Sequence, residues 1–561
     1  IIGRLVGSEM CIRDSIYYNH YLNASSTFGK YTPLEEEGQM LIIAGDALVD
    51  EIQPLATWKT QKGIKTTVVG TSTAGTTDAA IKSYVQNFYN ANSDLVYLLL
   101  VGDHNDVPSH TYGSSGWGEQ LWSDTYFAQL SGGNNDYYPE LFVGRFSGNA
   151  SDIETMVERT LEYEKNPADG NWMTRAIGLA SNEGAGYGDD GEADWQHARN
   201  NRTKLMNFGY TTVHEFYDGS QGGDDASGNP NASIISPAVN EGIGLFNYTG
   251  HGDENTCITG NYGSSHINSA TNNGKYPFVI SVACNNGTFT SGTCISEVWT
   301  RAKNAGSPSG SIAACGSSIL MAWAEPMQTQ DEMTDIIVES YANNKKTTLG
   351  GIFYNAQMST LEEYSSSTTA IEVMQTWVMF GDPSTVYRNK VTMDMTVTHI
   401  GNVPLGTTDV DVTCNTDGTT VAIVQDGIIL GKGVVSGGTV NITFPALTSN
   451  LPLTVTGTKQ NYRPYIGSIQ VADGPAGLND LLSEAIVMYP NPSNEFVTIG
   501  WDNSVAPERI SIQSISGQEV YSASQFQGGT HTVNTDQIAS GVYLVSVYAN
   551  GAVSTQRLII Q

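Results

Sequence analysis

The most constraining part of this chain is the stretch from residue 244 to residue 284, which contains two short apolar runs, 244–248 and 278–283. Gly, Asn and Pro bound both runs, and short apolar runs with such boundaries are typical of strands buried on both faces of a parallel sheet. His251 comes soon after the first run and Cys284 directly follows the second. Ligands of open α/β sheets bind outside the carboxyl ends of the strands, and neighbouring strands lie roughly 5 Å apart. We therefore predict that these two side chains face one substrate across adjacent strand ends.

The combination of a thiol and an imidazole points to nucleophilic catalysis. The thiolate is the nucleophilic form of cysteine, and a nearby imidazole can lower its pKa or carry its proton. Gly252 follows His251, and its backbone N–H can form an oxyanion hole together with the N–H of Cys284. The alternative interpretation is a buried structural cysteine and a histidine on a surface loop, which is the commoner arrangement for an isolated Cys–His pair.

Four separated motifs strengthen the catalytic interpretation. They are Asn-Tyr-Thr-Gly-His-Gly (247–252), Val-Ala-Cys-Asn-Asn-Gly (282–287), Gln-Asp-Glu-Met (330–333) and Phe-Gly-Asp-Pro-Ser (380–384). In this order they resemble the gingipain family of cysteine peptidases, most closely its arginine-specific branch, and the resemblance runs from about residue 31 to about residue 470. It implies a caspase-like α/β catalytic region of two subdomains with mostly parallel sheets. It also implies that His251 and Cys284 form the catalytic dyad.

Length and charge limit the classes of function. The 561 residues are too many for one core and indicate several domains. The 57 acidic residues against 26 basic ones give a net charge of −31, which argues against a nucleic-acid or anionic-membrane partner and fits an extracellular protein. No run of about 18 apolar residues predicts a transmembrane segment. The six cysteines are scattered and form neither a disulfide framework nor a zinc spacing.

The pattern along the chain predicts six segments. Residues 1–30 lack an initiator Met and a signal-peptide pattern, and we interpret them as an artefact or the remnant of a pro-segment. Strands alternate with helices over 31–165 and again over 166–390, which predicts two α/β subdomains, the second carrying the dyad. Period-two alternation and Gly turns over 391–472 predict a β-sandwich that corresponds to the Ig-like module of the family. Residues 473–484 are predicted to be a linker.

A second all-β module is predicted over 485–561. It contains Met-Tyr-Pro-Asn-Pro-Ser (488–493), Ser-Ile-Ser-Gly-Gln (514–518) and Ser-Gly-Val-Tyr-Leu-Val (540–545). These motifs resemble the C-terminal sorting domain of the type IX secretion system of Bacteroidetes. The resemblance implies contact with that secretion machinery and export across the outer membrane, followed by removal of the module or attachment to the cell surface. The alternative is one more adhesive β-domain.

The resemblance also implies a substrate pocket. An aspartate at the position of Asp194 lies at the base of the primary pocket in the family, where a carboxylate can take a guanidinium through two parallel hydrogen bonds. Trp323 and Met327 match the pocket walls, and Glu183 matches the acid that orients the catalytic histidine. Thr249 and Val282 complete the implied substrate-binding set. Without the resemblance, Asp194 is one acid among 57 and Glu183 is an acid at a turn.

Structural calcium is the only cofactor that we predict, with no redox or nucleotide cofactor. Asp103 follows a predicted strand, and alternating acids around a turn suit a hard cation that takes six to eight oxygen ligands. The family match assigns a first site to side chains and backbone oxygens of Asp103, Gly133, Asp136, Tyr138 and Glu140. A second site is assigned to Glu192, His197 and Glu297. The alternative is that these acids are solvated on loops.

Together these features predict a secreted or cell-surface cysteine endopeptidase that cleaves protein substrates after Arg. The motif Tyr-Thr-Pro at 31–33 resembles the start of the mature family enzymes, which implies a zymogen. Cleavage after Lys or another residue stays open within the same class. From a different class, the competing hypothesis is a catalytically idle surface protein whose β-modules bind glycan or host protein.

Overall fold

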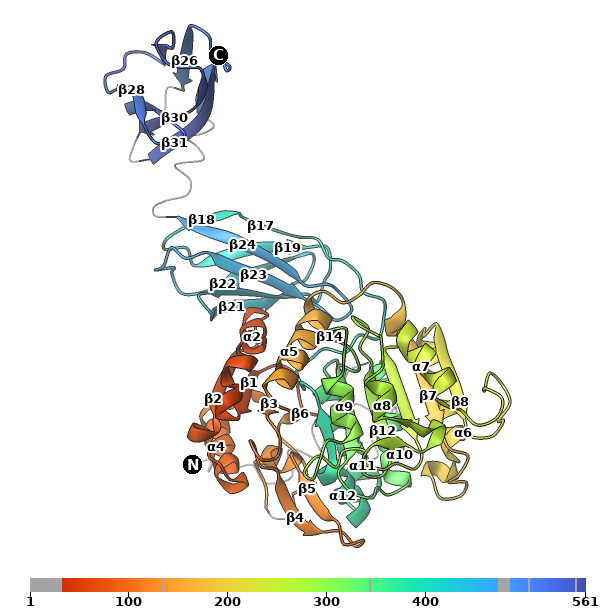
Figure 1. Ribbon diagram of the computed structural model, residues 1–561. Coiled ribbons are helices and arrows are strands. Elements are labelled where there is room, and N and C mark those ends of the chain that lie inside the picture. The colour runs from red at the N-terminus through yellow and green to blue at the C-terminus, as the bar shows by residue number, and fades with distance from the viewer. Residues whose placement is uncertain (1–32, 134–135, 343–344, 473–484, 503–504, 550–551) are drawn as a thin grey trace. The chain divides into compact units, whose positions relative to one another are not determined.

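The computed structural model describes residues 33–133, 136–342, 345–472, 485–502, 505–549 and 552–561. The predicted N-terminal segment 1–30 and the predicted linker 473–484 lie outside these residues. The α/β region precedes residue 391, and two regions of β-strands follow it in the sequence (Figure 1).

One mixed, mostly parallel sheet of ten strands organises the α/β region, in the order β2-β1-β3-β6-β16-β15-β12-β9-β7-β8. The caspase-like class of fold predicted from the sequence is therefore confirmed, with the two predicted halves joined in one sheet. The first half contains β1 (Gln39–Ala44), β2 (Thr66–Gly70), β3 (Leu95–Val101) and β6 (Phe142–Phe146). The second contains β7 (Arg175–Ala180), β8 (Thr212–Tyr217), β9 (Leu245–Thr249), β12 (Phe278–Val282) and β15 (Ala313–Ser317). The division at residue 165 stays a prediction.

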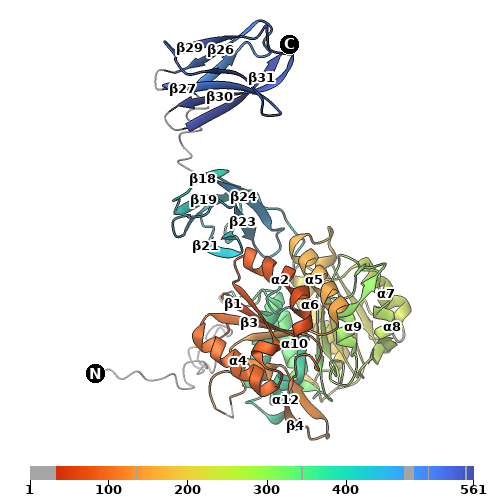
Figure 2. The ribbon, with the colours of Figure 1, turned by 60° about the vertical axis from the view of Figure 1, so that its left-hand side comes forward.

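The central strands carry almost unbroken apolar sequence because both of their faces are covered. Every residue of β9, β12 and β15 is buried, as expected for strands of an α/β sheet with helices on both sides. One layer of mutually packed helices contains α2 (Val49–Gln61), α5 (Ala150–Lys165), α8 (Ser264–Ile267) and α9 (Ile295–Arg301). The other contains α6 (Asp194–Phe208), α10 (Ala324–Ile337), α11 (Leu349–Glu363) and α12 (Thr368–Thr376). Figure 2 shows the first half of the sheet between α4 (Asp78–Ala91) and α2.

Local sequence accounts for the start of the helices. Thr77 accepts a hydrogen bond from the backbone N–H of Ala80 and caps α4, and Ile81 and Val85 bury one face of that helix. The cap at Thr77 and the spacing of these apolar residues therefore account for where α4 begins and which face it buries. At α5, Asn149 and Asp152 form a capping box.

Strand β16 (Trp377–Phe380) joins the two halves and runs antiparallel to β15. This strand is not predictable from the sequence, because four apolar residues directly after a helix do not distinguish a strand from a continuing helix. Close approach of the backbone is possible because Gly144 of β6 has no side chain. A Cβ at this position would lie 2.1 Å from the carbonyl oxygen of Gly381.

Shorter elements complete this region. They are α3 (Thr71–Ala74), the hairpin β4 (His110–Ser114) and β5 (Gln120–Ser123), α7 (Ala232–Glu241), β10 (Thr256–Cys257), β11 (Tyr262–Gly263), β13 (Lys303–Asn304), β14 (Ser307–Pro308) and, within the described residues, the five short 3-10 turns η2 (Asp46–Leu48), η3 (Thr125–Ala128), η4 (Trp172–Thr174), η5 (Asp189–Gly191) and η6 (Thr259–Asn261).

The remainder of the described chain consists of β-sheets. The predicted Ig-like module contains a three-stranded sheet, β17-β19-β22, and a five-stranded sheet, β18-β24-β23-β20-β21. Their bounds are β17 (Val397–His399), β18 (Asn402–Pro404), β19 (Asp409–Cys414), β20 (Thr420–Gln425), β21 (Ile428–Val434), β22 (Thr439–Thr443), β23 (Leu453–Thr458) and β24 (Tyr465–Ala472).

The last module contains a three-stranded sheet, β25-β26-β29, and a four-stranded sheet, β28-β27-β30-β31. The bounds are β25 (Ile486–Tyr489), β26 (Phe496–Trp501), β27 (Pro507–Ser514), β28 (Glu519–Ala523), β29 (Thr530–Asn534), β30 (Gly541–Ala549) and β31 (Ala552–Ile560). Their alternating inward residues form one apolar core that includes Val497, Ile510 and Val545. None of the helices in the described ranges is long and apolar enough to cross a membrane.

Candidate active site

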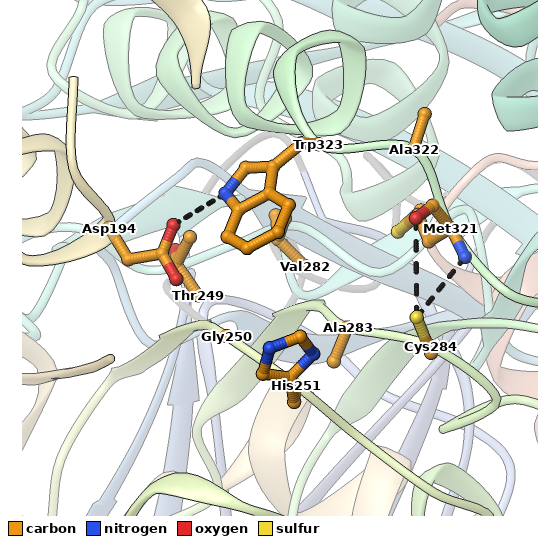
Figure 3. Close-up of a pocket in the computed structure, with 10 residues that line it drawn as sticks. All are labelled: Asp194, Thr249, Gly250, His251, Val282, Ala283, Cys284, Met321, Ala322 and Trp323. Carbon is orange, nitrogen blue, oxygen red and sulfur yellow. Dashed lines mark hydrogen bonds between the residues drawn. The ribbon is translucent and has the colours of Figure 1, made fainter. Parts of the chain in front are cut away.

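The predicted dyad lies at the carboxyl ends of two paired strands. β9 and β12 are parallel neighbours with Thr249 opposite Val282, so His251 and Cys284 each follow their strand by two residues. Both line one pocket of about 140 Å³ (Figure 3). The full lining is Asp194, Thr249, Gly250, His251, Val282, Ala283, Cys284, Met321, Ala322 and Trp323.

The imidazole of His251 contacts a carboxylate. Its Nε2 lies 3.0 Å from Oε2 of Glu183, which belongs to the loop after β7. The side chains of both residues are about half exposed, at 52% and 58%, so water screens much of this ion pair. The ring also packs edge-on against the indole of Trp323, with 5.6 Å between ring centroids. The contact between Glu183 and Nε2 of His251 has the geometry expected of an acid that orients the imidazole.

The thiol of Cys284 is half-buried and contacts the main chain of Met321. The N–H of Met321 donates to Sγ at 3.4 Å. Burial raises the pKa of the Cys284 thiol, and the negative charge of Glu119 adds to this, whereas the Met321 N–H lowers the pKa. In the substrate-free protein these effects favour the protonated thiol, so the nucleophile forms when the proton leaves for a base.

Close backbone packing explains the glycine after His251. A Cβ at Gly252 would lie 2.6 Å from the carbonyl oxygen of Cys284 and 2.7 Å from Nδ2 of Asn286. The main chain of the His251 loop therefore rests directly against the residue that carries the thiol. Asn286, which was not among the predicted site residues, connects the two loops by hydrogen bonds. Its Nδ2 donates to the carbonyl of Asp253 at 2.6 Å, and its Oδ1 accepts from Ser281 at 2.7 Å.

A buried acid closes one side of the pocket. Asp194 begins α6 and is completely buried. Its Oδ2 accepts from Ser181 Oγ at 2.5 Å and its Oδ1 accepts from the indole Nε1 of Trp323 at 2.8 Å (Figure 3). Burial raises the pKa of this carboxyl, although both hydrogen bonds lower it. Gly184 makes room for the pair, because a Cβ there would lie 2.6 Å from Nε1 of Trp323.

The predicted pocket residues differ in where they lie. Asp194, Thr249, Val282 and Trp323 line the pocket. Met327 does not: it is fully buried beneath the loop at Gly188, and Met321 forms part of the wall instead. The two methionines are six residues apart on either side of the start of α10, and the sequence offered no signal that favours Met321.

Comparison with known proteins identifies the family. A model described as peptidase family C25 matches residues 34–388. The chain belongs to peptidase family C25. Further models match the C25 C-terminal Ig-like domain at 398–472 and a secretion system C-terminal sorting domain at 487–561. The sorting domain indicates secretion or a place at the cell surface.

Several relatives within this family come from Porphyromonas gingivalis. Gingipain R1 is 35% identical over 84% of this chain and 46% of its own length. Gingipain R2 is 36% identical over 79% of this chain and 59% of its own length. Lys-gingipain HG66 is 27% identical over 83% of this chain and 27% of its own length. The chain thus spans between about a quarter and three fifths of these relatives, and the resemblance to gingipains predicted from the motifs is confirmed.

A solved structure supports the fold of this C25 chain. The crystal structure of the Arg-specific cysteine proteinase gingipain R superposes with a TM-score of 0.73 at 34% identity, over 79% of this chain and all of that one.

The calcium ligands predicted for the C25 chain fall into three groups. Asp103 was assigned to a site with Glu140, but β3 and β6 run parallel with Tyr97 opposite Phe142. Asp103 therefore lies beyond the carboxyl end of this strand pair, whereas Glu140 lies before its amino end. Glu140 instead accepts from the backbone N–H groups of Leu130 and Ser131. The structure does not bring Asp103 and Glu140 into one site.

The other predicted members of that first site are also engaged within the protein. Asp136 accepts from the backbone N–H of Tyr138, and the hydroxyl of Tyr138 contacts Glu362. Gly133 accepts from the N–H of Asp136 through its carbonyl. A calcium site among Gly133, Asp136 and Tyr138 stays a prediction.

Glu297 lies with Asp103 rather than with His197, which corrects the second predicted site. Arg301 donates to Oδ1 of Asp103 at 2.8 Å and to Oε1 of Glu297 at 2.5 Å. Ser147 bridges the same two acids at 2.9 and 2.6 Å. A guanidinium is already the cation between these carboxylates, so the cluster does not fit a calcium ion. Nothing in the sequence indicates that Asp103 and Glu297 lie together, because Asp103 follows β3 and Glu297 belongs to α9, far apart in the chain.

Glu192 and His197 do come together, and Asp331 joins them. Nδ1 of the buried His197 lies 3.6 Å from Glu192 and 3.5 Å from Asp331, and its Nε2 contacts Gln330 at 2.9 Å. The two carboxylates raise the pKa of His197 against the opposing effect of burial. Oδ1 of Asp331 is buried and has no hydrogen-bond partner among the described residues. No group of three or more His, Cys, Asp or Glu in the described ranges is arranged as a metal site.

Proposed function

We propose that the chain is a secreted cysteine endopeptidase that cleaves peptide bonds after Arg, with Cys284 as nucleophile and His251 as acid–base. The observation that carries this proposal is the buried carboxylate of Asp194 in the same pocket as the thiol and the imidazole. A buried carboxylate is costly unless a cation or hydrogen-bond donors meet it. Arg is the side chain whose planar fork can meet both carboxylate oxygens, and the indole of Trp323 adds a surface for stacking.

The reaction begins with transfer of the thiol proton. Glu183 contacts Nε2 of His251, which leaves Nδ1 to take the proton from Sγ of Cys284. As the proton moves, sulfur attacks the carbonyl carbon and the carbonyl oxygen becomes an oxyanion. Backbone N–H groups of Gly252 and Cys284 are the proposed donors to this oxyanion, whose charge appears only in the transition state and the intermediate.

Collapse of the intermediate breaks the C–N bond. The imidazolium of His251 gives its proton to the leaving amine, and the acyl group stays on Cys284 as a thioester. Water then attacks the thioester while His251 takes one of its protons. Breakdown of the second intermediate releases the carboxylic acid product and returns the proton to the thiol. Glu183 stabilises the imidazolium in both halves of the reaction.

The experiment is a measurement of kcat/KM for three matched peptides that differ only in having Arg, Lys or Leu before the scissile bond. Labelling by an arginyl chloromethylketone, compared between the wild type and Cys284→Ala, identifies the nucleophile independently. A preference for Lys or Leu overturns the Arg assignment. Absence of both turnover and labelling favours a binding protein without catalysis.

Structural calcium stays a proposal at Glu192 and His197, beside which Asp331 adds a second carboxylate, although the described residues show no three such side chains already arranged as a metal site. Oδ1 of Asp331 is buried and accepts no hydrogen bond among the described residues, and a carboxylate oxygen suits a hard cation. The contact between Nε2 and Gln330 leaves Nδ1 of a neutral His197 as the ring nitrogen that faces both carboxylates and can bind an ion beside them. The competing interpretation is a protonated His197 that provides the positive charge itself.

Contact of residues 487–561 with the type IX secretion machinery remains a proposal that rests on the sorting-domain match.

A further inference from the structure

The segment 318–323 forms the wall of the pocket beside the thiol. It follows β15, and its residues Met321, Ala322 and Trp323 all line the pocket. On one side it is bonded to the chain that follows Cys284, where the N–H of Asn285 donates to the carbonyl of Ile319 at 3.0 Å. The position of this segment therefore sets where the Met321 N–H and the Trp323 indole stand relative to the substrate.

The hairpin β4–β5 holds the other side of the segment. Oγ of Ser318 donates to the carbonyl of Trp122 at 2.9 Å. The carboxylate of Glu119 accepts from the backbone N–H of Leu320 at 2.6 Å. Hydrogen bonds to a charged acceptor are shorter and stronger than neutral ones. This contact lies one residue before Met321, whose N–H donates to Sγ of Cys284.

The turn of the hairpin fixes Glu119 itself. The N–H of Ser115 donates to the carbonyl of Glu119 at 2.7 Å, and the N–H of Glu119 donates back to Oγ of Ser115 at 3.2 Å. Gly118 adopts a φ of 84°, which side chains of L-residues rarely allow. Glu119 is half-buried, so its carboxylate is partly withdrawn from water where it meets the segment.

We propose that Glu119 is a positioning residue of the peptidase: it holds segment 318–323 so that the Met321 N–H meets the thiol of Cys284, and it sets the charge beside that thiol. The proposal rests on the proposed function in taking Cys284 as the nucleophile. Two observations support this role of Glu119. Its carboxylate accepts a hydrogen bond from Leu320, which is adjacent to Met321, and its negative charge raises the pKa of Cys284.

Other charged groups near the pocket come from different elements. His251 stands at the end of β9 with Glu183 from the loop after β7, and Asp194 stands at the start of α6. Asp194 is bonded to Ser181 and Trp323, and Glu183 is paired with His251. Burial, backbone N–H groups and Glu119 shift the pKa of Cys284, and of these Glu119 is the charged side chain.

Two substitutions separate the two roles of Glu119. In Glu119→Gln the amide oxygen still accepts from Leu320, but the charge is removed. In Glu119→Ala both the charge and the anchor are lost. Glu154→Gln serves as the matched control, because it removes one exposed carboxylate from α5.

The first measurement is the pH dependence of alkylation of Cys284 by iodoacetamide, quantified on the peptide that contains it. It reports the thiol without requiring peptide hydrolysis. For Glu119→Gln we expect the midpoint to fall by about half a pH unit, because a nearby negative charge disfavours the thiolate. For Glu119→Ala we expect a midpoint above that of Glu119→Gln, since a displaced Met321 N–H stabilises the thiolate less.

The second measurement is steady-state hydrolysis of the best peptide substrate. We expect Glu119→Ala to lose about tenfold or more in kcat/KM, because small misplacements of catalytic groups are costly, and Glu119→Gln to stay within about threefold at the pH optimum. An alkylation profile and a kcat/KM equal to wild type in Glu119→Ala would overturn the proposal, as would identical midpoints for Glu119→Gln and Glu154→Gln. Retained hydrolysis in Cys284→Ala would overturn the proposed function instead.

Discussion

The pocket acid gives the sharpest prediction about specificity. Asp194→Ala removes the buried carboxylate that accepts from Ser181 and Trp323. In the proposed complex the guanidinium of the substrate approaches the same carboxylate and gains a charge-assisted, planar pair of hydrogen bonds. The substitution therefore removes a partner that an Arg substrate needs and a Leu substrate does not.

The magnitude follows from the surroundings of Asp194. Loss of a buried charge pair costs roughly 2–5 kcal/mol, which corresponds to about 30- to 5,000-fold in kcat/KM. We expect the lower end of this range, about 30- to 100-fold, because two donors already stabilise the carboxylate in the free protein and binding must displace one of them. Burial also raises the pKa of Asp194, so the free-energy cost of keeping its carboxylate ionised offsets part of the free energy gained from the Arg side chain.

The assay compares kcat/KM for matched Arg, Lys and Leu peptides in wild type and Asp194→Ala. Turnover of the Leu peptide is the internal control, and we expect it to change by less than about threefold if the variant folds. An unchanged ratio of Arg to Leu turnover in Asp194→Ala would refute the role of Asp194, even if the dyad were correct. A uniform loss on all three peptides would indicate a structural defect and would equally contradict a specificity role.

The remaining predictions concern the dyad, pH and calcium. Cys284→Ala should abolish hydrolysis without a change in melting temperature, whereas Cys257→Ala should keep activity; hydrolysis that survives the loss of Cys284 would disprove the nucleophile. Glu183→Gln should lower kcat by about tenfold with little effect on KM, because the contact orients His251 but is largely exposed; an effect on KM alone would contradict this role. Since the pKa of Asp194 is raised, the preference for Arg over Leu should disappear on acidification at a higher pH than that of an ordinary aspartate, near 3.9, as measured by the ratio of kcat/KM values across pH. Calcium should raise the melting temperature of wild type but not of Asp331→Asn; equal shifts in both would exclude the proposed site.

The sequence predicted the local elements of the site but not the contacts between distant segments. The runs that became β9 and β12 were identifiable because buried parallel strands are short, apolar and bounded by Gly, Asn and Pro. Their parallel pairing then placed His251 and Cys284 in one pocket, as predicted. The predicted contact between Glu183 and His251 also agrees with the geometry.

The errors arose where long-range packing decides. The two sets of calcium ligands were assigned from the family match, but in this chain Arg301 binds both Asp103 and Glu297 and so places them in one cluster. Met321 was overlooked in favour of Met327, because the residue at which α10 begins decides which methionine faces the pocket. Glu119 carries no motif at all, and its importance is visible only where the hairpin meets segment 318–323.

The hydroxyl of Ser181 has a consequence for attempts to change specificity. It donates to Asp194 and accepts from the backbone N–H of Glu183, so the group that selects the substrate and the loop that orients the base share one rotatable O–H. A redesign that replaces Asp194 alone would leave this hydroxyl without its carboxylate acceptor, although the N–H of Glu183 would still donate to it. A pocket for a different substrate side chain should therefore be designed at positions 181 and 194 together, so that the new pair satisfies the hydroxyl and keeps the Glu183 loop in place.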